Sequence, residues 1–372
     1  MKIHPPLIEL LGGRWRFEVP VAAAAWNHDG AVAAFGLADG TVALARASWE
    51  GGPEVTPRLA GGIEVRPPTV SSPPVSRVSV HNGATRTLVA QPGAGFLSGG
   101  DDGVMHIGRD GIVTRDSEFP ERRVSVLAAG PAGWRACAAG REAIITGRSK
   151  HVLTLPSEVS TLAFDLPGHC LAVAHQDGTN IWSGDGTPMR DLQFRGLPRT
   201  LVWSPDGAWL AVGLDAGGVH AWRLADNVDV ALGGFSGAGR ALSFSSDARL
   251  LATSGARRVL YWQLGPEYLA EPGECGLPST RAPVCVVAFH PSRLLVAAGY
   301  ESGTVLLCQP GTEDVLFARS AGGGAPLTLA WSPEGQRLVF ATEGGEAGIM
   351  LLPDGLFRAN LAATCNGQDA QP

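Results

Sequence analysis

The chain has 372 residues, of which 45% are hydrophobic and 17% charged, with 50 glycines, 27 prolines and a formal net charge of −6 at pH 7. The acidic balance argues against broad binding to nucleic acid or to anionic lipid, because both require a basic face. The apolar content is ample for a large core, and the many glycines and prolines indicate a fold rich in turns.

The N-terminal sequence predicts neither a secretory signal nor a membrane anchor. The start MKIHPPLIELL has one lysine and a short apolar patch, whereas a signal peptide needs about 7–15 apolar residues and a spanning helix roughly 20. The six cysteines lie far apart without a Cys-x-x-Cys pair, so we expect free, buried thiols. Only two of the 29 basic residues are lysines, a bias typical of GC-rich bacterial genes. We expect a cytoplasmic bacterial protein.

A segment of about 40 residues repeats along the chain. Each copy opens with an apolar run that ends in a turn, as in LVWSPDG at 201–207 and LAWSPEG at 329–335. The residue at the end of each opening run defines an anchor position, occupied by Trp26, Ala90, Ala129, Phe164, Trp203, Phe244, Phe289 and Trp331. Successive anchors are separated by 64, 39, 35, 39, 41, 45 and 42 residues. All but the first spacing lie near the roughly 40–45 residues of a propeller blade.

Each copy continues with two more short apolar runs and a closing segment. Second runs such as WLAVGL at 209–214 and third runs such as GVHAWRL at 218–224 are separated by glycine-containing turns, and TPMRDLQFRG at 187–196 is a fourth run. Runs of this length, rich in Val, Leu and Trp, predict antiparallel strands and leave no room for helices. One such sheet cannot bury both faces alone, but neighbouring sheets in a closed ring can.

The sequence therefore predicts an all-β fold, with residues 1–372 forming a single closed β-propeller of four-stranded antiparallel blades. Eight blades are preferred, and seven is the alternative because copies 2 and 3 match the repeat poorly. Residues 14–19 are expected to close the last blade as its outer strand. The Pro- and Gly-rich segment 49–77 is expected to be a loop insertion after the third strand of blade 1. Residues 359–372 are expected to be a flexible tail.

The stretch WSPDGAWLAVGLDAGGVHAWRL at 203–224 resembles the WD40 repeat family, and the similarity extends from about residue 14 to 358. Trp182, Trp222 and Trp262 stand at the Trp of the family's Trp-Asp dipeptide, although the Asp is replaced in all three. No copy has the family's Gly-His dipeptide before its first strand, so the Asp-His-Ser-Trp hydrogen-bond tetrad is expected to be incomplete. The resemblance implies ring closure by strand exchange between the termini and a narrower face used for partners.

Enzyme signatures are not found in the sequence. Neither lysine follows a glycine, which excludes a P-loop, and the histidines fall on separated blades and cannot meet on one metal ion. The first strands supply Ala, Thr, Ser, Val and Arg to the central channel instead of the acids and histidines of a metalloenzyme. We predict a non-catalytic protein without cofactor or metal. The alternative is an enzyme, or a small-molecule- or metal-binding propeller, that uses the channel.

Arginines recur at the positions where the chain enters successive blades. Arg86, Arg199 and Arg240 lie four residues before the anchors of copies 2, 5 and 6, and Arg123 and Arg281 lie near the equivalent place in copies 3 and 7. The family resemblance implies that such residues line the rim of the narrower face, where guanidinium groups favour a carboxylate or phosphate. The alternative is that an arginine-rich proteome places Arg at any exposed strand start.

Trp49 is the remaining interface candidate, because an aromatic residue leads into the proline-rich segment 49–77. Together these features predict a monomeric protein-interaction scaffold. Its partner is expected to be a protein or peptide, with an acidic one favoured by the arginines, and neither nucleic acid nor a membrane.

Overall fold

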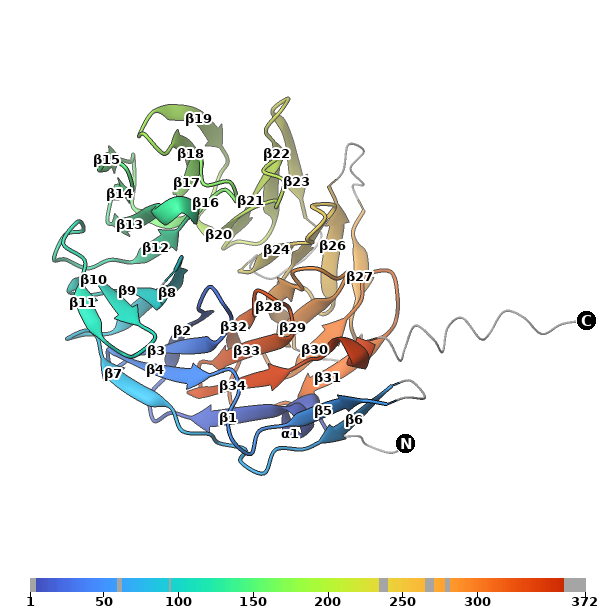
Figure 1. Ribbon diagram of the computed structural model, residues 1–372. Helices are drawn as coiled ribbons and strands as arrows, with labels where there is room; N and C mark the ends of the chain where they lie inside the picture. The colour runs from blue at the N-terminus through green and yellow to red at the C-terminus, as the bar shows by residue number, and fades with distance from the viewer. Residues whose placement is uncertain are drawn as a thin grey trace, which may run out of the picture.

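The computed structural model describes residues 5–58, 62–93, 95–233, 240–264, 271–277 and 282–357. Within these ranges, eight four-stranded antiparallel sheets stand in a ring, and a two-stranded sheet lies outside it (Figure 1). The prediction of an eight-bladed all-β propeller is confirmed. The seven-blade alternative is wrong, because copies 2 and 3 each form a complete four-stranded sheet. The predicted tail 359–372 lies outside the described residues.

The blades follow one another around the ring in chain order, and each has its first strand innermost. Blade 1 consists of β2 (Val21–Trp26), β3 (Val32–Leu37), β4 (Thr41–Arg46) and β7 (Ser76–Ser79), and blade 2 of β8 (Thr85–Gln91), β9 (Gly95–Gly100), β10 (Gly103–Gly108) and β11 (Val113–Arg115). Blade 3 consists of β12 (Val126–Ala129), β13 (Arg135–Ala139), β14 (Glu142–Thr146) and β15 (His151–Thr154), and blade 4 of β16 (Val159–Phe164), β17 (Cys170–His175), β18 (Gly178–Ser183) and β19 (Pro188–Gln193).

Blade 5 consists of β20 (Pro198–Trp203), β21 (Trp209–Leu214), β22 (Val219–Arg223) and β23 (Val228–Leu232), and blade 6 of β24 (Leu242–Phe244), β25 (Leu250–Thr253), β26 (Val259–Gln263) and β27 (Gly273–Cys275). Blade 7 consists of β28 (Val284–Phe289), β29 (Val296–Tyr300), β30 (Val305–Cys308) and β31 (Val315–Arg319), and blade 8 of β32 (Pro326–Trp331), β33 (Arg337–Thr342), β34 (Glu346–Leu351) and β1 (Gly12–Arg16). The remaining elements are helix α1 (Leu7–Leu11), strands β5 (Glu54–Pro57) and β6 (Ile63–Arg66), and the 3-10 turn η1 (Pro131–Gly133). No helix in the described ranges is long and apolar enough to cross a membrane.

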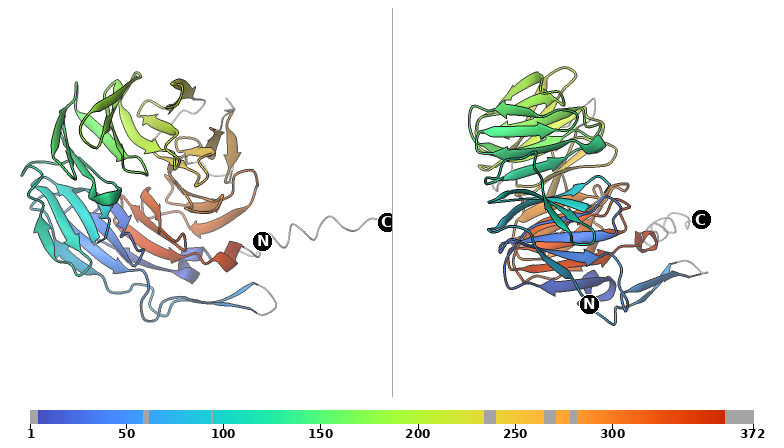
Figure 2. Two further views of the ribbon diagram at one scale, coloured as in Figure 1. Left: turned by 45° about the horizontal axis from the view of Figure 1, so that its top comes forward. Right: turned by 60° about the vertical axis from the view of Figure 1, so that its left-hand side comes forward.

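The antiparallel order gives the ring two different faces. All first strands start on one face, which also holds the turns between second and third strands, and we call it the upper face. The opposite face holds the turns from first to second and from third to fourth strands, and we call it the lower face. The edge-on view in Figure 2 shows the β5–β6 hairpin and the helical turn at 354–357 projecting on the same side of the ring.

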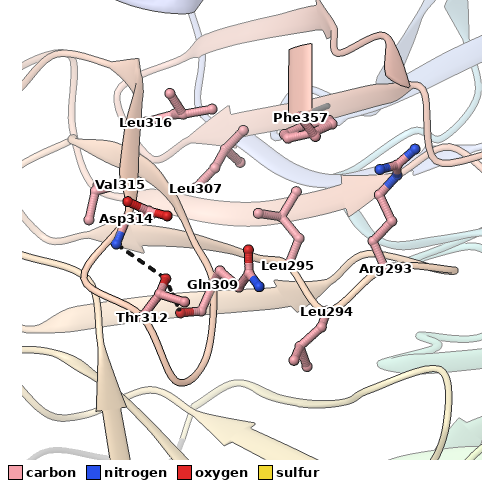
Figure 3. A pocket seen from close by; sticks show the side chains of 10 residues that line it. All are labelled: Arg293, Leu294, Leu295, Leu307, Gln309, Thr312, Asp314, Val315, Leu316 and Phe357. Carbon is pink, nitrogen blue, oxygen red and sulfur yellow. Dashed lines mark hydrogen bonds between the residues drawn. The ribbon is translucent and has the colours of Figure 1, made fainter. Parts of the chain in front are cut away.

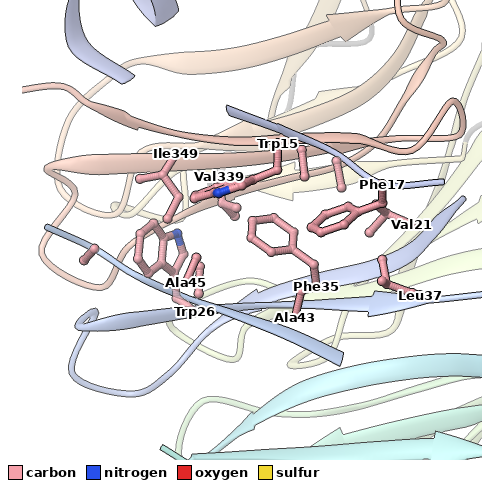
Figure 4. Close-up of a cluster of buried hydrophobic side chains, with 14 residues drawn as sticks. Trp15, Phe17, Val21, Trp26, Phe35, Leu37, Ala43, Ala45, Val339 and Ile349 are labelled. Atoms are coloured by element: carbon pink, nitrogen blue, oxygen red, sulfur yellow. The ribbon is translucent and has the colours of Figure 1, made fainter. Parts of the chain in front are cut away.

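The ring is closed by β1, which pairs with β34 as the outer strand of blade 8. This strand was expected at 14–19, but it spans Gly12–Arg16 because α1 leads directly into it. Its Trp15 ring and the Phe17 ring lie 5.7 and 6.2 Å from the ring of Phe35 on blade 1 (Figure 4). The first and last parts of the chain therefore share one buried apolar cluster.

The segment 49–77 is not a plain loop, because it contains the β5–β6 hairpin and reaches the start of β7. The hairpin tolerates Pro57 since both of its edges are open. Residues 71–73 run along the free edge of β1. The Arg14 N–H donates to the Ser71 carbonyl at 2.9 Å, the Ser72 hydroxyl to the Arg14 carbonyl at 2.8 Å, and the Trp15 indole N–H to the Pro73 carbonyl at 2.6 Å. The insertion thus covers the edge of the closing strand.

The tryptophan anchors mark ties between neighbouring blades. The indole N–H groups of Trp26, Trp203 and Trp331 each donate to a carbonyl of the preceding blade at 3.0 Å, namely those of Ala330, Ala163 and Ala288. Each acceptor directly precedes the anchor residue of its own blade. An indole needs a hydrogen-bond partner when it is buried, so a tryptophan anchor links the inner strands around the ring.

Candidate functional site

The upper face presents side chains from a bulge that recurs in the first strands. In six blades the first strand skips one residue of its pairing with the second strand directly after its first residue. A bulge leaves one residue unpaired and redirects its side chain. In blades 2 and 5 the bulged residues are Arg86 and Arg199, so two of the predicted arginines occupy one structural position.

Both bulged arginines bind an aspartate of their own blade. Arg86 Nε lies 2.7 Å from Asp101 Oδ1, and Arg199 Nε lies 2.7 Å from Asp215 Oδ1. Each aspartate sits in the turn between the second and third strands, beside the bulge. The hydrogen bond from Arg86 lowers the pKa of Asp101, and the hydrogen bond from Arg199 lowers the pKa of Asp215. Both carboxyl groups are therefore ionised at neutral pH.

Each aspartate also faces an arginine that enters the next blade. Arg123 Nε lies 3.9 Å from Asp101 Oδ1. The charge of Arg240 likewise contributes to the lowered pKa of Asp215. We call Arg86, Asp101 and Arg123 the blade 2 cluster, and Arg199, Asp215 and Arg240 the blade 5 cluster. Each cluster holds two guanidinium groups and one carboxylate, which leaves one uncompensated positive charge.

The clusters are accessible, but they are separate. The Arg123 side chain is 65% exposed and that of Arg199 50%, and Arg240 is also exposed. The clusters lie three blades apart in the ring (Figure 1), so the predicted arginines do not all converge on one point. Arg281 lies outside the described residues. The pairs Arg86–Asp101 and Arg199–Asp215 are separated by 15 and 16 residues, a recurrence that the sequence analysis missed.

Trp49 lies away from both clusters. Its indole N–H donates to the Val70 carbonyl at 2.8 Å, and a Cβ atom at Gly13 would lie 2.9 Å from its ring. The ring therefore packs onto β1 from within the insertion. It lines a groove of about 1280 Å³ between the insertion and the lower ends of blades 1 and 2.

Blade 2 contains an acid–imidazole–hydroxyl relay that resembles the order of a hydrolase triad. His81 Nδ1 lies 2.5 Å from Asp102 Oδ1, and His81 Nε2 lies 2.8 Å from Ser98 Oγ. Ser98 is 0% exposed, so no substrate reaches its hydroxyl. Burial favours protonation of Asp102, but hydrogen bonds from His81 and from the Asn82 N–H outweigh it and lower the pKa of that carboxyl. The relay ties the chain before β8 to β9 and β10.

Asp, His and Ser are also three of the four residue types in the hydrogen-bond tetrad that the WD40 resemblance implies, the fourth being Trp. Strand register places Ile107 where Trp182, Trp222 and Trp262 stand in blades 4 to 6, each opposite the residue that pairs with the anchor. No tryptophan therefore stands at this register position in blade 2. His81 was missed because the residue before it is Val80, which removes the Gly-His signature.

A second, partly buried network is centred on Asp116 and joins blades 2 and 3. His106 Nε2 lies 2.9 Å from Asp116 Oδ2, Arg135 also binds Asp116, and Arg135 Nη2 lies 2.7 Å from Glu118 Oε2. Each charged group in this network has an opposite or hydrogen-bonding partner, which is the usual arrangement of a structural ion pair. In the ranges that the structure describes, no three His, Cys, Asp or Glu side chains are grouped to hold a metal ion.

An apolar cavity of about 330 Å³ opens on the lower side of blade 7 (Figure 3). Its lining residues are Arg293, Leu294, Leu295, Leu307, Gln309, Thr312, Asp314, Val315, Leu316 and Phe357. The Arg293 guanidinium lies 5.5 Å from the centre of the Phe357 ring and donates to Asp354 at 2.5 Å. Arg293 thereby holds the helical turn at 354–357 as one wall of the cavity.

Comparison with known proteins yields the fold and nothing finer. The chain matches no protein-family description and no curated protein. Among solved structures it is similar to the crystal structure of the computationally designed Ika8 protein. The TM-score is 0.72 at 16% identity, over 92% of this chain and 99% of the designed one. The structural similarity shows a shared fold, and at this level of sequence identity it carries no function.

Proposed function

We propose that this protein is a non-catalytic, WD40-like scaffold whose upper face binds an acidic segment of a protein partner. The observation that carries the proposal is the repeated bond from a bulged arginine to an aspartate of its own blade, with a second exposed arginine at the entry to the next blade. A cluster with one unbalanced guanidinium attracts a further carboxylate. The propeller supports this role because its rigid strands hold many turns in a fixed arrangement.

The geometry of the pairs favours an added carboxylate over simple charge neutralisation. A guanidinium has five N–H donors, and the bond to Asp215 from Arg199 uses the Nε donor. The aspartate positions the planar group without saturating it. An incoming Glu or Asp side chain can then bind in the bidentate geometry that arginine prefers.

Binding of a defined acidic probe tests the proposal. We would measure the fluorescence anisotropy of a labelled Glu-rich peptide with the full-length protein and with Arg199→Glu, Arg240→Glu and Arg86→Glu. A charge-assisted hydrogen bond is worth about 1.5–3 kcal/mol, so each variant is expected to weaken binding by roughly tenfold or more. Wild-type binding should also weaken as salt is added.

The matched control is Arg249→Glu. Arg249 has a side chain that is 77% exposed, and it pairs with Asp247 in a turn on the lower face. This variant makes the same change of charge and should leave peptide binding unchanged. Equal loss in the Arg249 and Arg199 variants would reduce the effect to net charge, and full binding by Arg199→Glu would remove the upper-face site. Binding of a Gln-substituted peptide as tightly as the Glu-rich one would also contradict the proposal.

A further inference from the structure

Two buried thiols meet between blades 6 and 7. Cys275 ends the outer strand of blade 6, β27, and Cys308 ends the third strand of blade 7, β30. Their sulfur atoms are 3.3 Å apart, and the residues are 0% and 1% exposed. Other described cysteines have different neighbours: Cys170 Sγ lies 3.6 Å from the Met189 sulfur, and Cys285 Sγ lies 3.2 Å from the Pro326 carbonyl.

Strand register explains why the two sulfur atoms meet. Cys308 pairs with Val296, which places it where Trp262 stands in blade 6 opposite Leu251. A cysteine occupies far less volume than a tryptophan, so the neighbouring blade can extend a side chain into this position. The residue after Cys275 is Gly276, which has φ +88°, and a Cβ atom there would lie 2.9 Å from the Tyr300 hydroxyl of blade 7. The chain is thus pressed against blade 7 at this point.

We propose that Cys275 and Cys308 form an oxidation site, at which a peroxide converts the two thiols into a disulfide between blades 6 and 7. One thiolate attacks a peroxide oxygen and becomes a sulfenic acid, with release of the first water. The second sulfur then attacks the sulfenic sulfur, and the hydroxyl leaves as the second water. Two thiols and one hydrogen peroxide thereby give one disulfide and two waters. The sulfur atoms must approach from 3.3 Å to about 2.05 Å, the length of a disulfide bond.

The closed protein keeps this reaction slow. The hydrogen bond from Cys275 and the burial of the site both raise the pKa of Cys308, so its reactive thiolate is scarce. The strand that carries Cys275 has three residues and pairs on one side with β26. Local opening of such a short edge strand exposes its thiol far more often than global unfolding does. The disulfide, once formed, prevents that opening by fixing the outer strand of blade 6 to blade 7.

Peptide mapping of the full-length protein tests the site directly. The native protein would be exposed to hydrogen peroxide, alkylated and digested with trypsin. Cys275, Cys285 and Cys308 fall in three separate tryptic peptides, 259–281, 282–293 and 294–319. We expect peptides 259–281 and 294–319 to be joined, with the mass expected for loss of two hydrogen atoms, and to separate on reduction. Peptide 282–293 should remain alkylated.

Thermal unfolding gives an independent readout. Oxidation is expected to raise the unfolding midpoint by a few degrees, because a cross-link between blades restricts the unfolded chain. Cys275→Ala should abolish this rise, whereas Cys285→Ala should retain it. If Cys275→Ala fails to fold, peptide mapping of the wild type still decides the question. The proposal is overturned if both peptides stay alkylated after prolonged oxidation, or if either cysteine pairs elsewhere in the chain or with a second molecule.

Discussion

The two ends of the first strands follow opposite rules. At the upper end the bulge position holds chemically unrelated residues, namely Ala22, Arg86, Ser160, Arg199, Cys285 and Leu327. At the lower end the anchor is an aromatic residue in six of eight blades, and three tryptophan anchors bond to the preceding blade. The bulged arginines bind acids of their own blade, whereas the tryptophan anchors complete the packing between blades. Cys285 is the exception among the bulged residues, since its Sγ lies 3.2 Å from the Pro326 carbonyl of blade 8.

The same comparison predicts where substitutions are costly. An anchor tryptophan contributes buried area and a hydrogen bond that crosses between blades. A bulged arginine contributes a solvent-exposed ion pair inside its own blade, and such pairs stabilise proteins little. Effects on stability should therefore decrease from the lower end of the first strands to the upper end.

The largest effect is expected for Trp26→Ala, because Trp26 is buried between blades 8 and 1. Loss of a buried aromatic side chain should lower the free energy of unfolding by about 3–5 kcal/mol. Trp26→Phe keeps an aromatic ring but removes the donor to the Ala330 carbonyl, and should cost about 1 kcal/mol. Denaturant titration of both variants checks the ranking. An equal loss in the two would show that the indole N–H, and not the ring, carries the tie.

His81→Ala tests whether a buried contact on the upper side of blade 2 stabilises the protein. The change leaves Ser98 and Asp102 without their shared partner, and should lower the free energy of unfolding by about 2–3 kcal/mol. Ser98→Ala, which removes the neutral member, should cost about 1 kcal/mol. If His81→Ala unfolds at the wild-type denaturant concentration, the relay contributes no stability, and its role as a structural tie is wrong.

His290 makes the lower end sensitive to pH. Its Nε2 bonds to the Gly335 carbonyl at 2.9 Å, its Nδ1 accepts the Ser292 N–H at 3.1 Å, and burial lowers its pKa below the ordinary value of 6.5. The unfolded chain therefore binds the proton more readily than the folded protein. The stabilisation is complete above about pH 6.5 and is lost as pH falls through the lowered pKa. Thermal unfolding of wild type and His290→Gln across this range measures it, and identical pH profiles would contradict it.

The smallest effect on stability is expected for Arg199→Glu. The Arg199 side chain is 50% exposed and its partner Asp215 lies in a surface turn, so water replaces the lost pair. Its unfolding midpoint should equal those of wild type and of the lower-face variant Arg249→Glu. A destabilisation as large as that of Trp26→Phe would contradict this expectation, because the bulged residue would then stabilise the fold.

Features that repeat with the blade period could be predicted from the sequence, and features that depend on one insertion could not. The anchors and glycine turns predict eight sheets because each copy contains its own strands and turns. The β5–β6 hairpin was missed because Pro53 and Pro57 flank and end β5, and Pro67 and Pro68 directly follow β6, so the prolines obscure both short strands. The contact of residues 71–73 with β1 joins parts of the chain 58 residues apart, and no local sequence pattern predicts such a contact.

The candidate site was only partly predictable for a related reason. The sequence identified Arg86 and Arg199 by their distance from the anchors, but it did not identify their partners Asp101 and Asp215. Their pairing follows from the bulge, which depends on how two strands register against each other. Trp49 was predicted as an interface residue because it precedes a proline-rich segment, and its packing against Gly13 could not be read from that position alone.

By itself, the sequence determined that this chain folds as a ring of small antiparallel sheets. Strand formation and turns depend on residues close together in the chain, and a repeated pattern adds the same local preference eight times. Only the tertiary structure decided which side chains meet across blades, such as Cys275 with Cys308 or Trp26 with Ala330. Those contacts depend on the rotation and register of neighbouring sheets, where a shift of one residue turns a side chain to the opposite face.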